Sequence, residues 1–316
     1  MPVRPATEEA IAAAAQALAE GDLVAFPTET VYGLGANALD GHAVARVFAV
    51  KERPRFNPLI VHVANLEAAG SYGVFDATAH KLAEAFWPGP LSLVLPLRPE
   101  CGIADLVTAG LGTIALRVPH HAAAQALLAE AKLPLAAPSA NRSGRISPTS
   151  ASHVEAELGD TPAMILDGGP CKHGLESTVV GIVGGEPILL RLGSLPREAI
   201  EAVLGHSIAR AEEDAAISSP GQLERHYAPE TPLRLGATDL REVDALLAFG
   251  PDAPQGARTS INLSPTGNLE EAASHLFAAL RELDASGASG IAVMPIPSHG
   301  LGEAINDRLQ RAAKAR

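Results

Sequence analysis

The chain has few cysteines, few aromatic residues and an excess of negative charge, and each of these features narrows the class of protein. Its 316 residues include only two cysteines, Cys101 and Cys171, and no C-x-x-C motif, which excludes a disulfide framework. We therefore expect two reduced thiols and a cytoplasmic protein. Aromatic residues make up only 3% of the chain, but 47% is hydrophobic, which is enough apolar material for a substantial core.

Membrane-spanning and secretory segments are also missing. No apolar run approaches the ~20 residues that a transmembrane helix needs. The Ala-rich N-terminal stretch is flanked by Glu8, Glu9, Glu20 and Asp22 and lacks a Leu- or Val-rich centre, so it predicts a helix and not a signal peptide. With 24 Lys and Arg against 36 Asp and Glu, the net charge of −12 argues against a surface that coats nucleic acid or anionic lipid.

Several familiar catalytic motifs are absent as well. The chain has no G-x-x-x-x-G-K-[ST] phosphate loop, and the absence of a G-x-S-x-G elbow disfavours a serine hydrolase. The His120–His121 pair has no third ligand at a recognisable spacing, so we predict no metal site. Gly33-x-Gly35-x-x-Ala38 matches a dinucleotide fingerprint only in form, because the polar insert PTETVY separates its glycines from the preceding strand. We therefore reject a nicotinamide site.

Apolar runs alternate with helical patterns over residues 1–205. This order predicts an α/β domain with a large, twisted, mixed sheet. Strands are expected at 23–26, 59–63, 91–97, 113–118, 135–137, 163–166, 178–182 and 187–191. Helices are expected at 7–20, 42–50, 77–86, 121–131, 148–158 and 196–204, the last two with proline at the first helical position.

A polar segment containing proline and glycine interrupts the pattern at residues 206–231 and predicts a linker, which we expect to act as a lid. Alternation resumes in residues 232–316. There we expect strands at 233–235, 259–263 and 290–294 and helices at 239–248, 268–284 and 302–314. This order predicts a small, three-layer, Rossmann-like C-terminal domain.

Polar residues gather where the expected strands and helices end. A loop with hydroxyls and a carboxylate, 27–32, follows the first strand, and Lys51-Glu-Arg-Pro-Arg-Phe-Asn57 places three cations at a helix end. Arg117, in an apolar strand, needs an anion from the protein or from a ligand, because an unpaired buried charge is costly. The hydroxyl- and amide-rich loop 138–148 precedes a helix and suits phosphate.

Each of these segments also has a purely structural interpretation. Basic residues often complement the C-terminus of a helix, and a histidine in an apolar strand, such as His62, is usually a core residue. The distribution of charge favours a ligand site. Segments 51–57, 113–121, 139–147 and 191–197 hold eight of the 24 Lys and Arg but only one of the 36 Asp and Glu, which predicts a local anion pocket in an acidic protein.

Seven blocks, in order, resemble the YrdC-like threonylcarbamoyl-AMP synthase family: FPTETVYGLGANA, KERPRFNPLIVHV, FWPGPLSLVL, LGTIALRVP, APSANRSGRISPT, GLESTVVGI and LRLGS. The linker SPGQLERHYAP and the tail GLGEAINDRLQRAA are similar to the longer, two-domain form. The resemblance implies a nucleotidyltransferase that makes L-threonylcarbamoyl-AMP and pyrophosphate from L-threonine, bicarbonate and ATP. It also implies Mg²⁺ carried with ATP, no tightly bound organic cofactor, no stable nucleic-acid or membrane binding, and downstream enzymes that transfer the threonylcarbamoyl group to tRNA.

The same resemblance implies roles for individual residues. Those expected to contact threonine are Thr30, His62, Arg117, Ala137 (through its backbone) and Ser177. Those expected to contact ATP are Arg53, Asn57, Thr113, Ser139, Ser147, Arg191 and Tyr227. The expected catalytic cluster is Lys51, Arg53 and Asn141, with Lys51, Arg53 and Arg191 neutralising the triphosphate.

Other functions remain open on the residues alone. One is a carbamoyltransferase relative that forms carbamoyl-adenylate, although such relatives carry zinc-finger modules and this chain has no C-x-x-C pair. Another is a tRNA-binding module without enzymatic activity. A third is a non-catalytic α/β protein that binds a small ligand.

Overall fold

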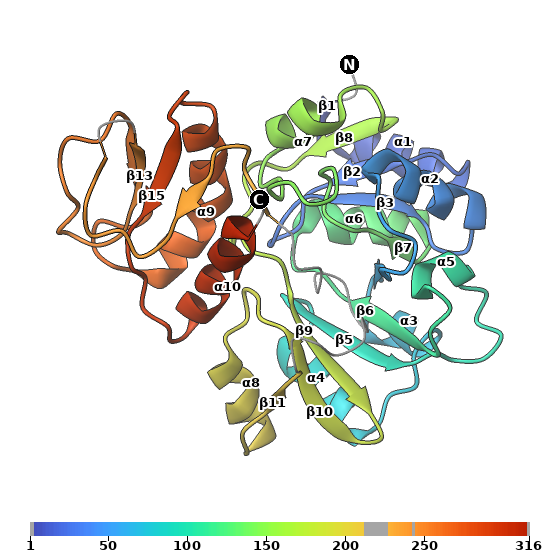
Figure 1. Cartoon of the computed structure of the whole chain (residues 1–316). Coiled ribbons are helices and arrows are strands. Elements are labelled where there is room, and N and C mark those ends of the chain that lie inside the picture. The colour runs from blue at the N-terminus through green and yellow to red at the C-terminus, as the bar shows by residue number, and fades with distance from the viewer. Residues whose placement is uncertain (1–2, 212–226, 242–243, 315–316) are drawn as a thin grey trace.

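The computed structural model describes residues 3–211, 227–241 and 244–314, which form two units, each built around its own sheet (Figure 1). The larger sheet contains β1 (Val3–Pro5), β2 (Val24–Phe26), β3 (Gly33–Asn37), β4 (Ile60–His62), β5 (Leu91–Pro96), β6 (Thr113–Arg117), β7 (Leu135–Ala136), β8 (Met164–Asp167), β9 (Thr178–Val183), β10 (Glu186–Arg191) and β11 (Ala209–Arg210). Among the described residues, the strand order is β1-β8-β2-β3-β7-β4-β6-β5-β9-β10-β11. The β4–β6 pair is parallel and the β5–β6 pair antiparallel, which confirms the predicted large mixed sheet.

Neighbouring residues of a strand point to opposite faces of the sheet, so both faces can carry apolar side chains on which helices pack. Val24 and Phe26 belong to the cluster that packs under α1 (Glu8–Ala19) and α6 (Ala122–Ala131), whereas Leu23 and Ala25 belong to the other, larger cluster. The remaining helices of this unit are α2 (Gly41–Lys51), α3 (Leu66–Gly70), α4 (Ala77–Phe86), α5 (Asp105–Thr108), α7 (Ala151–Leu158) and α8 (Arg197–Leu204).

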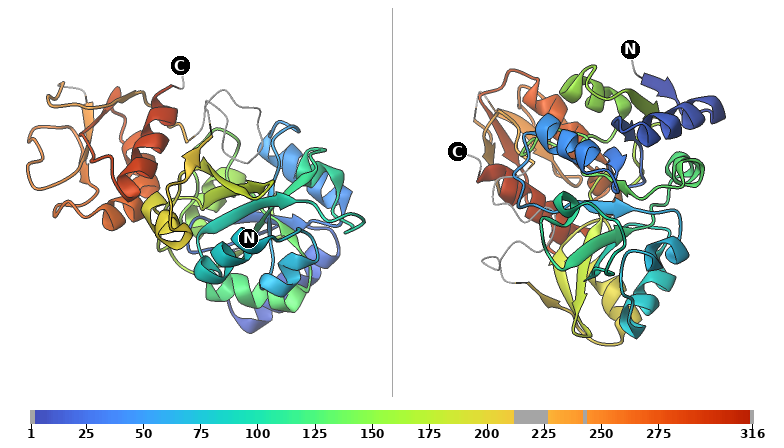
Figure 2. Two further views of the ribbon diagram at one scale, coloured as in Figure 1. Left: turned by 90° about the horizontal axis from the view of Figure 1, so that it is seen from below. Right: turned by 90° about the vertical axis from the view of Figure 1, so that its right-hand side faces the viewer.

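The second unit is a smaller, parallel sheet. Its strands are β12 (Leu233–Arg234), β13 (Asp244–Ala248), β14 (Ser260–Asn262) and β15 (Gly290–Val293), in the order β12-β15-β13-β14. Its helices, α9 (Leu269–Asp284) and α10 (Leu301–Ala313), lie between this sheet and the first unit (Figures 1 and 2). The predicted α/β C-terminal module is therefore confirmed at the level of the fold.

The helix expected at 239–248 is wrong, because residues 244–248 form strand β13. This apolar run is short, and a run of that length has no distinctive period. Ala245 and Leu247 face the helical side, whereas Leu246 and Ala248 pack against Ala237 and neighbouring loop residues. Loops therefore cover the second face, and the predicted three-layer arrangement is wrong as well.

Two local expectations about helix starts also fail. Ser150, and not Pro148, immediately precedes α7, and its hydroxyl accepts from the amide of His153. Pro196 occupies the N-cap of α8 and not its first helical position. Pro196 lies directly before α8 and Pro148 two residues before the N-cap of α7, so both stay outside the helix interior that proline would disrupt.

The glycines of the apparent dinucleotide fingerprint lie in strand β3, antiparallel to β2. A Cβ at Gly35 would stand 2.8 Å from a ring carbon of Phe26. Close packing of a buried ring, and not the approach of a phosphate, therefore accounts for this glycine. These glycines therefore do not form the strand-to-helix turn that a dinucleotide fingerprint requires.

The two units meet closely. A Cβ at Gly174, which has a φ of +69°, would lie 2.5 Å from the carbonyl oxygen of Ser274 on α9, so this approach requires glycine. Buried apolar residues of both units belong to one cluster. Within the described part of the chain, no helix is both long and apolar enough to cross a membrane.

Candidate active site

A cavity lies beside the ends of β4 and β6 and the loops that follow β2 and β7. Strand ends and loops of an α/β sheet are common places for ligands. Its described lining includes three arginines, Arg53, Arg117 and Arg191, and one carboxylate, Glu176. The lining is therefore cationic, as the clustering of basic residues in the sequence predicts.

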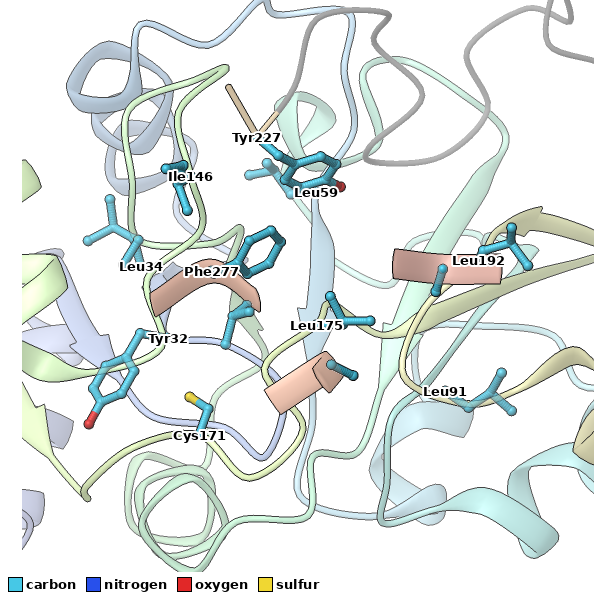
Figure 3. Close-up of a cluster of buried hydrophobic side chains, with 14 of the residues drawn as sticks. Tyr32, Leu34, Leu59, Leu91, Ile146, Cys171, Leu175, Leu192, Tyr227 and Phe277 are labelled. Carbon is cyan, nitrogen blue, oxygen red and sulfur yellow. The ribbon is translucent and has the colours of Figure 1, made fainter. Parts of the chain in front are cut away.

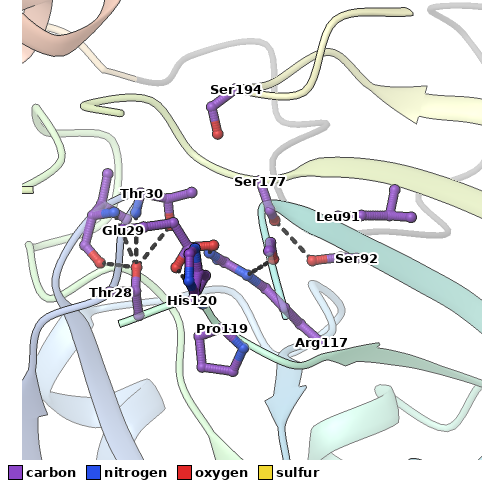
Figure 4. A network of polar contacts seen from close by, with 12 residues as sticks. Thr28, Glu29, Thr30, Leu91, Ser92, Arg117, Pro119, His120, Ser177 and Ser194 are labelled. Atoms are coloured by element: carbon purple, nitrogen blue, oxygen red, sulfur yellow. Dashed lines mark hydrogen bonds and ion pairs between the residues drawn. The ribbon is translucent and has the colours of Figure 1, made fainter. Parts of the chain in front are cut away.

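Arg117 and His62 lie side by side, in register on parallel strands β6 and β4. Nη2 of Arg117 forms an ion pair with Oε1 of Glu29 at 2.8 Å, and the amide of His120 donates to Oε2 of Glu29 at 2.9 Å (Figure 4). Burial by itself raises the pKa of the Glu29 carboxyl, but Arg117 and the hydrogen bonds outweigh it and lower the pKa below its usual value. Of the two partners considered for Arg117, the structure supplies the protein carboxylate, while Arg117 still lines the cavity.

His62 is buried and neutral. Burial, and then the charge of Arg117, lower the pKa of its imidazole to about 3. Its Nδ1 has no hydrogen-bond partner among the described residues. A buried polar atom without a partner is costly, which favours a ligand contact over the purely structural interpretation of this histidine.

Lys51 lies at the end of α2 beneath the 138–148 loop. Its Nζ donates to the carbonyl of Ser139 at 2.6 Å and to the carbonyl of Asn141. Burial, and then the charge of Arg53, lower the pKa of Lys51 well below its usual value. In this structure Lys51 fixes the loop and does not line the cavity.

Arg53 and Arg191 place two half-buried cations on one wall. Nη2 of Arg53 donates to the carbonyl of Pro58 at 2.9 Å, and Nη2 of Arg191 donates to the carbonyl of Ser177 at 2.8 Å. Burial, and then the charge of Arg191, lower the pKa of Arg53 to about 10, and burial also lowers the pKa of Arg191. An anionic ligand between two such guanidiniums would be stabilised by both.

Ser177 connects this wall to the sheet. Its Oγ lies 2.7 Å from Oγ of Ser92 on β5 (Figure 4). The same oxygen accepts from Nη2 of Arg191 at 3.0 Å. The orientation of the Ser177 hydroxyl is therefore fixed by groups from two strands.

Tyr227 is the first residue that the structure describes after residue 211. It lines the cavity and is fully buried. Its ring stacks on Phe277 of α9 with centroids 5.6 Å apart (Figure 3). Burial, the largest influence, raises the pKa of Tyr227 to about 12. The expected lid falls mostly on residues 212–226, which lie outside the described residues.

The cavity brings together most of the residues that the sequence singles out. Those that line it are Arg53, His62, Arg117, Ala137, Ser139, Ser177, Arg191 and Tyr227. Those buried nearby but not lining it are Thr30, Lys51, Asn57, Asn141 and Ser147. Thr113 stands four residues from Arg117, at the other end of β6, which at ~3.3 Å per residue is about 13 Å away.

Three charged residues of the site escaped the sequence analysis as site residues. Glu29 pairs with Arg117, and Glu176 pairs with Arg308 of α10 through Nε and Oε2 at 2.9 Å. Arg308 does carry a signal in the sequence, because it falls on the same helical stripe as the buried residues Ile305, Leu309 and Ala312. A charged residue on an apolar stripe indicates a buried partner.

The fold and the cavity define a class: two-unit α/β proteins in which a cavity at strand ends is lined by a cationic wall. Comparison with known proteins narrows the class. The family model for Sua5, YciO and YrdC proteins, described as "Telomere recombination", matches residues 16–193, and the model described as "Threonylcarbamoyl-AMP synthase, C-terminal domain" matches residues 195–314.

Relatives match over nearly the whole chain. The threonylcarbamoyl-AMP synthase of Bacillus subtilis is 40% identical, over 97% of this chain and 93% of the relative. That of Pyrococcus abyssi is 41% identical, over 98% and 96%. The crystal structure of P. abyssi Sua5 complexed with L-threonine superimposes with a TM-score of 0.90 at 38% identity, covering 100% of this chain and 97% of that one. The chain belongs to the threonylcarbamoyl-AMP synthase family, in its two-domain form, which confirms the resemblance seen in the sequence.

Proposed function

We propose that this protein synthesises L-threonylcarbamoyl-AMP and pyrophosphate from L-threonine, bicarbonate and ATP, for threonylcarbamoyladenosine formation in tRNA. The observation that carries the proposal is the adjacency, in one cavity, of the His62–Arg117 pair and the Arg53–Arg191 pair. One pair suits a small amino acid, and the other suits a polyphosphate. The names of the full-length relatives support the same reaction.

The amino-acid half of the site is built around Arg117. Its guanidinium, held on one edge by Glu29, meets the carboxylate of threonine at the cavity surface. Unprotonated His62, with its Nδ1 unpaired among the described residues, accepts a hydrogen bond from the substrate or donates one, according to its tautomer. Ser177, the Ala137 backbone and the buried Thr30 complete this half.

The nucleotide half lies along the cationic wall. Arg53 and Arg191 neutralise the phosphates, and Ser139 lines the cavity beside them. Asn57, whose side-chain amide has no partner in the described part of the chain, offers both a donor and an acceptor. Ser147, Tyr227 and Thr113 are the further ATP contacts of the proposal. Lys51 contributes by holding the carbonyls of the loop that contains Ser139 and Asn141.

The chemistry needs no covalent enzyme intermediate. The threonine amine adds to bicarbonate, giving a carbamate and releasing water. A carbamate oxygen then attacks the α-phosphorus of ATP, forming the P–O bond of threonylcarbamoyl-AMP while the bond to the leaving pyrophosphate breaks. Both reactants are anions, so the catalytic contribution of the site is to hold them together and neutralise their charge. Mg²⁺ enters as part of the MgATP substrate, on the phosphate oxygens.

Release of pyrophosphate tests the proposal. It should require ATP, threonine and bicarbonate together, and removing either threonine or bicarbonate should abolish it. Equal release with serine in place of threonine, or without bicarbonate, would overturn the assignment. Turnover of carbamoyl phosphate without threonine would support the carbamoyltransferase alternative, and saturable tRNA binding without ATP would support the non-enzymatic module.

The place of the reaction in the cell belongs to the same proposal. The product is a reactive mixed anhydride, so we propose that downstream tRNA threonylcarbamoyl-transfer enzymes consume it in the cytoplasm. The protein's own acidic surface argues against stable binding of tRNA, since its net charge is −12.

A further inference from the structure

Arg308 is a fully buried arginine of the C-terminal unit that extends to the wall of the cavity. Its Nε donates to Oε2 of Glu176 at 2.9 Å, its Nη1 to Oδ2 of Asp307 at 2.7 Å and its Nη2 to the carbonyl of Leu192 at 2.8 Å. Its guanidinium carbon also lies 4.8 Å from the ring centroid of Tyr227. All three nitrogens of this side chain are therefore bonded to protein, as a buried guanidinium requires.

Glu176 is one of the residues through which the two units contact each other. Its Oε2 accepts from Arg308, and its Oε1 accepts from the hydroxyl of Ser147 at 2.5 Å. The same side chain is the one carboxylate among the described residues that line the cavity. A single group thus joins α10 of the second unit to the 138–148 loop of the first.

A carboxylate in this wall would repel the proposed polyanionic substrate unless its charge were compensated. Coulombic repulsion at short range is strong where water is excluded. Arg308 supplies the compensating charge from outside the first unit. Its planar guanidinium is itself held by the carbonyl of Leu192, so its hydrogen bond also fixes the rotamer of Glu176. Ser147 and Tyr227 both contact this pair, so its geometry sets theirs.

We propose that Arg308 is a positioning residue through which the C-terminal unit completes the nucleotide half of the site: it neutralises Glu176 and orients Ser147 and Tyr227. The inference rests on the proposed function for the identity of the nucleotide. It assigns the C-terminal unit a role in substrate binding and not only in stability.

The simpler interpretation is that Arg308 only holds the two units together, and the structure offers a matched control. Arg197 of α8 also binds α10, with Nη2 at 2.9 Å from Oε1 of Glu303 and Nε at 3.3 Å from Oε2. Arg197 does not line the cavity or contact Glu176. Its loss therefore weakens docking without changing the charge of the wall.

The experiment compares full-length Arg308→Met, Arg308→Lys, Glu176→Gln, Arg308→Met/Glu176→Gln and Arg197→Met. For each variant, Kd for MgATP is measured by calorimetry, KM and kcat by pyrophosphate release, and Tm by thermal unfolding. Arg308→Met should raise Kd and KM for MgATP roughly tenfold or more while changing KM for threonine by less than about threefold. Arg308→Lys should recover part of this loss, because it restores the charge but not the planar fork.

The double variant provides the decisive comparison. It removes the charges of both buried partners, so it tests the proposal even if Arg308→Met does not fold. Its Kd for MgATP should return to within about threefold of that of Glu176→Gln, whereas Arg197→Met should lower Tm with Kd unchanged within about twofold. The proposal is overturned if Arg308→Met behaves like Arg197→Met, or if the double variant binds MgATP no better than Arg308→Met. Failure of the proposed reaction is a separate result, seen as wild-type protein that binds MgATP but releases no pyrophosphate with threonine and bicarbonate.

Discussion

The side chain of Arg53 binds the backbone of Asn57 and not its side chain: Nε of Arg53 donates to the carbonyl of Asn57 at 3.2 Å. Asn57 is completely buried, yet both atoms of its side-chain amide lack partners among the described residues. Buried amides are normally hydrogen-bonded, so this one is arranged for a group that arrives with the substrate.

We therefore expect Asn57→Ala to weaken MgATP binding about tenfold while changing the free energy of unfolding by less than about 1 kcal/mol, because no internal hydrogen bond is lost. Calorimetric titration and urea unfolding of the same preparation measure both quantities. A large loss of stability with unchanged MgATP affinity would show that the amide is a structural group.

Substitutions in the Arg117–Glu29 ion pair distinguish a role in threonine binding from a role in stability. Arg117→Ala should abolish threonine binding and leave MgATP affinity within about threefold, and it should also destabilise the fold by about 3–5 kcal/mol because Glu29 remains buried and unpaired. Arg117→Met/Glu29→Gln is the matched control. It should recover most of the stability, as followed by chemical unfolding, but no threonine binding. Threonine affinity in the double variant close to that of the wild type would contradict the assignment of Arg117.

The pH dependence of stability tests the environment of His62. Its folded pKa is depressed to about 3 from an unfolded value near 6.5, so between these values the unfolded chain binds a proton that the folded chain does not. Stability is therefore lost as pH falls below about 6.5, and from pH 7 to pH 5 this one group contributes a loss of about 2 kcal/mol. The loss should be smaller by that amount in His62→Asn, compared by urea unfolding at the two pH values. An unchanged difference would mean that the pKa of His62 is the same in the folded and the unfolded chain.

Lys51 provides a test of loop positioning. Its ammonium binds the carbonyls of Ser139 and Asn141, so Lys51→Met leaves two carbonyls without a donor and should destabilise the protein by about 1–3 kcal/mol. We expect kcat to fall more than KM for threonine rises, because the loop is misplaced while Arg117 is intact. Loss of threonine affinity alone, measured by calorimetry, would place Lys51 in the amino-acid half instead.

Much of the fold follows from local patterns. Helix α4 begins and ends where the sequence predicts, since Asp76 caps it and its apolar positions recur with helical spacing. The sequence predicts a helix where β13 lies because residues 244–248 form a short apolar run, and only packing between helices and loops decides its conformation. The sequence does not predict strand β3, because its two glycines are typical of a turn and only the packing of Phe26 against Gly35 explains them.

The residues of the candidate site also divide into those that a local sequence pattern predicts and those that it does not. Residues at strand and helix ends, such as Arg53 and His62, are recognisable because charged or titratable groups stand out against apolar runs. Glu29 and Arg308 act through partners 88 and 132 positions away along the chain, a relation that no local pattern contains. The sequence therefore reveals the groups that face the ligand more readily than the groups that hold them.

The most direct test of the account is to incubate the full-length protein with MgATP, L-threonine and ¹³C-bicarbonate and to identify the nucleotide product by mass spectrometry. We predict a threonine adduct of AMP that contains the heavy carbon, formed in equal amount with pyrophosphate and absent when threonine is left out. A threonine adduct of AMP without the label, or labelled product that forms without threonine, would contradict the central claim.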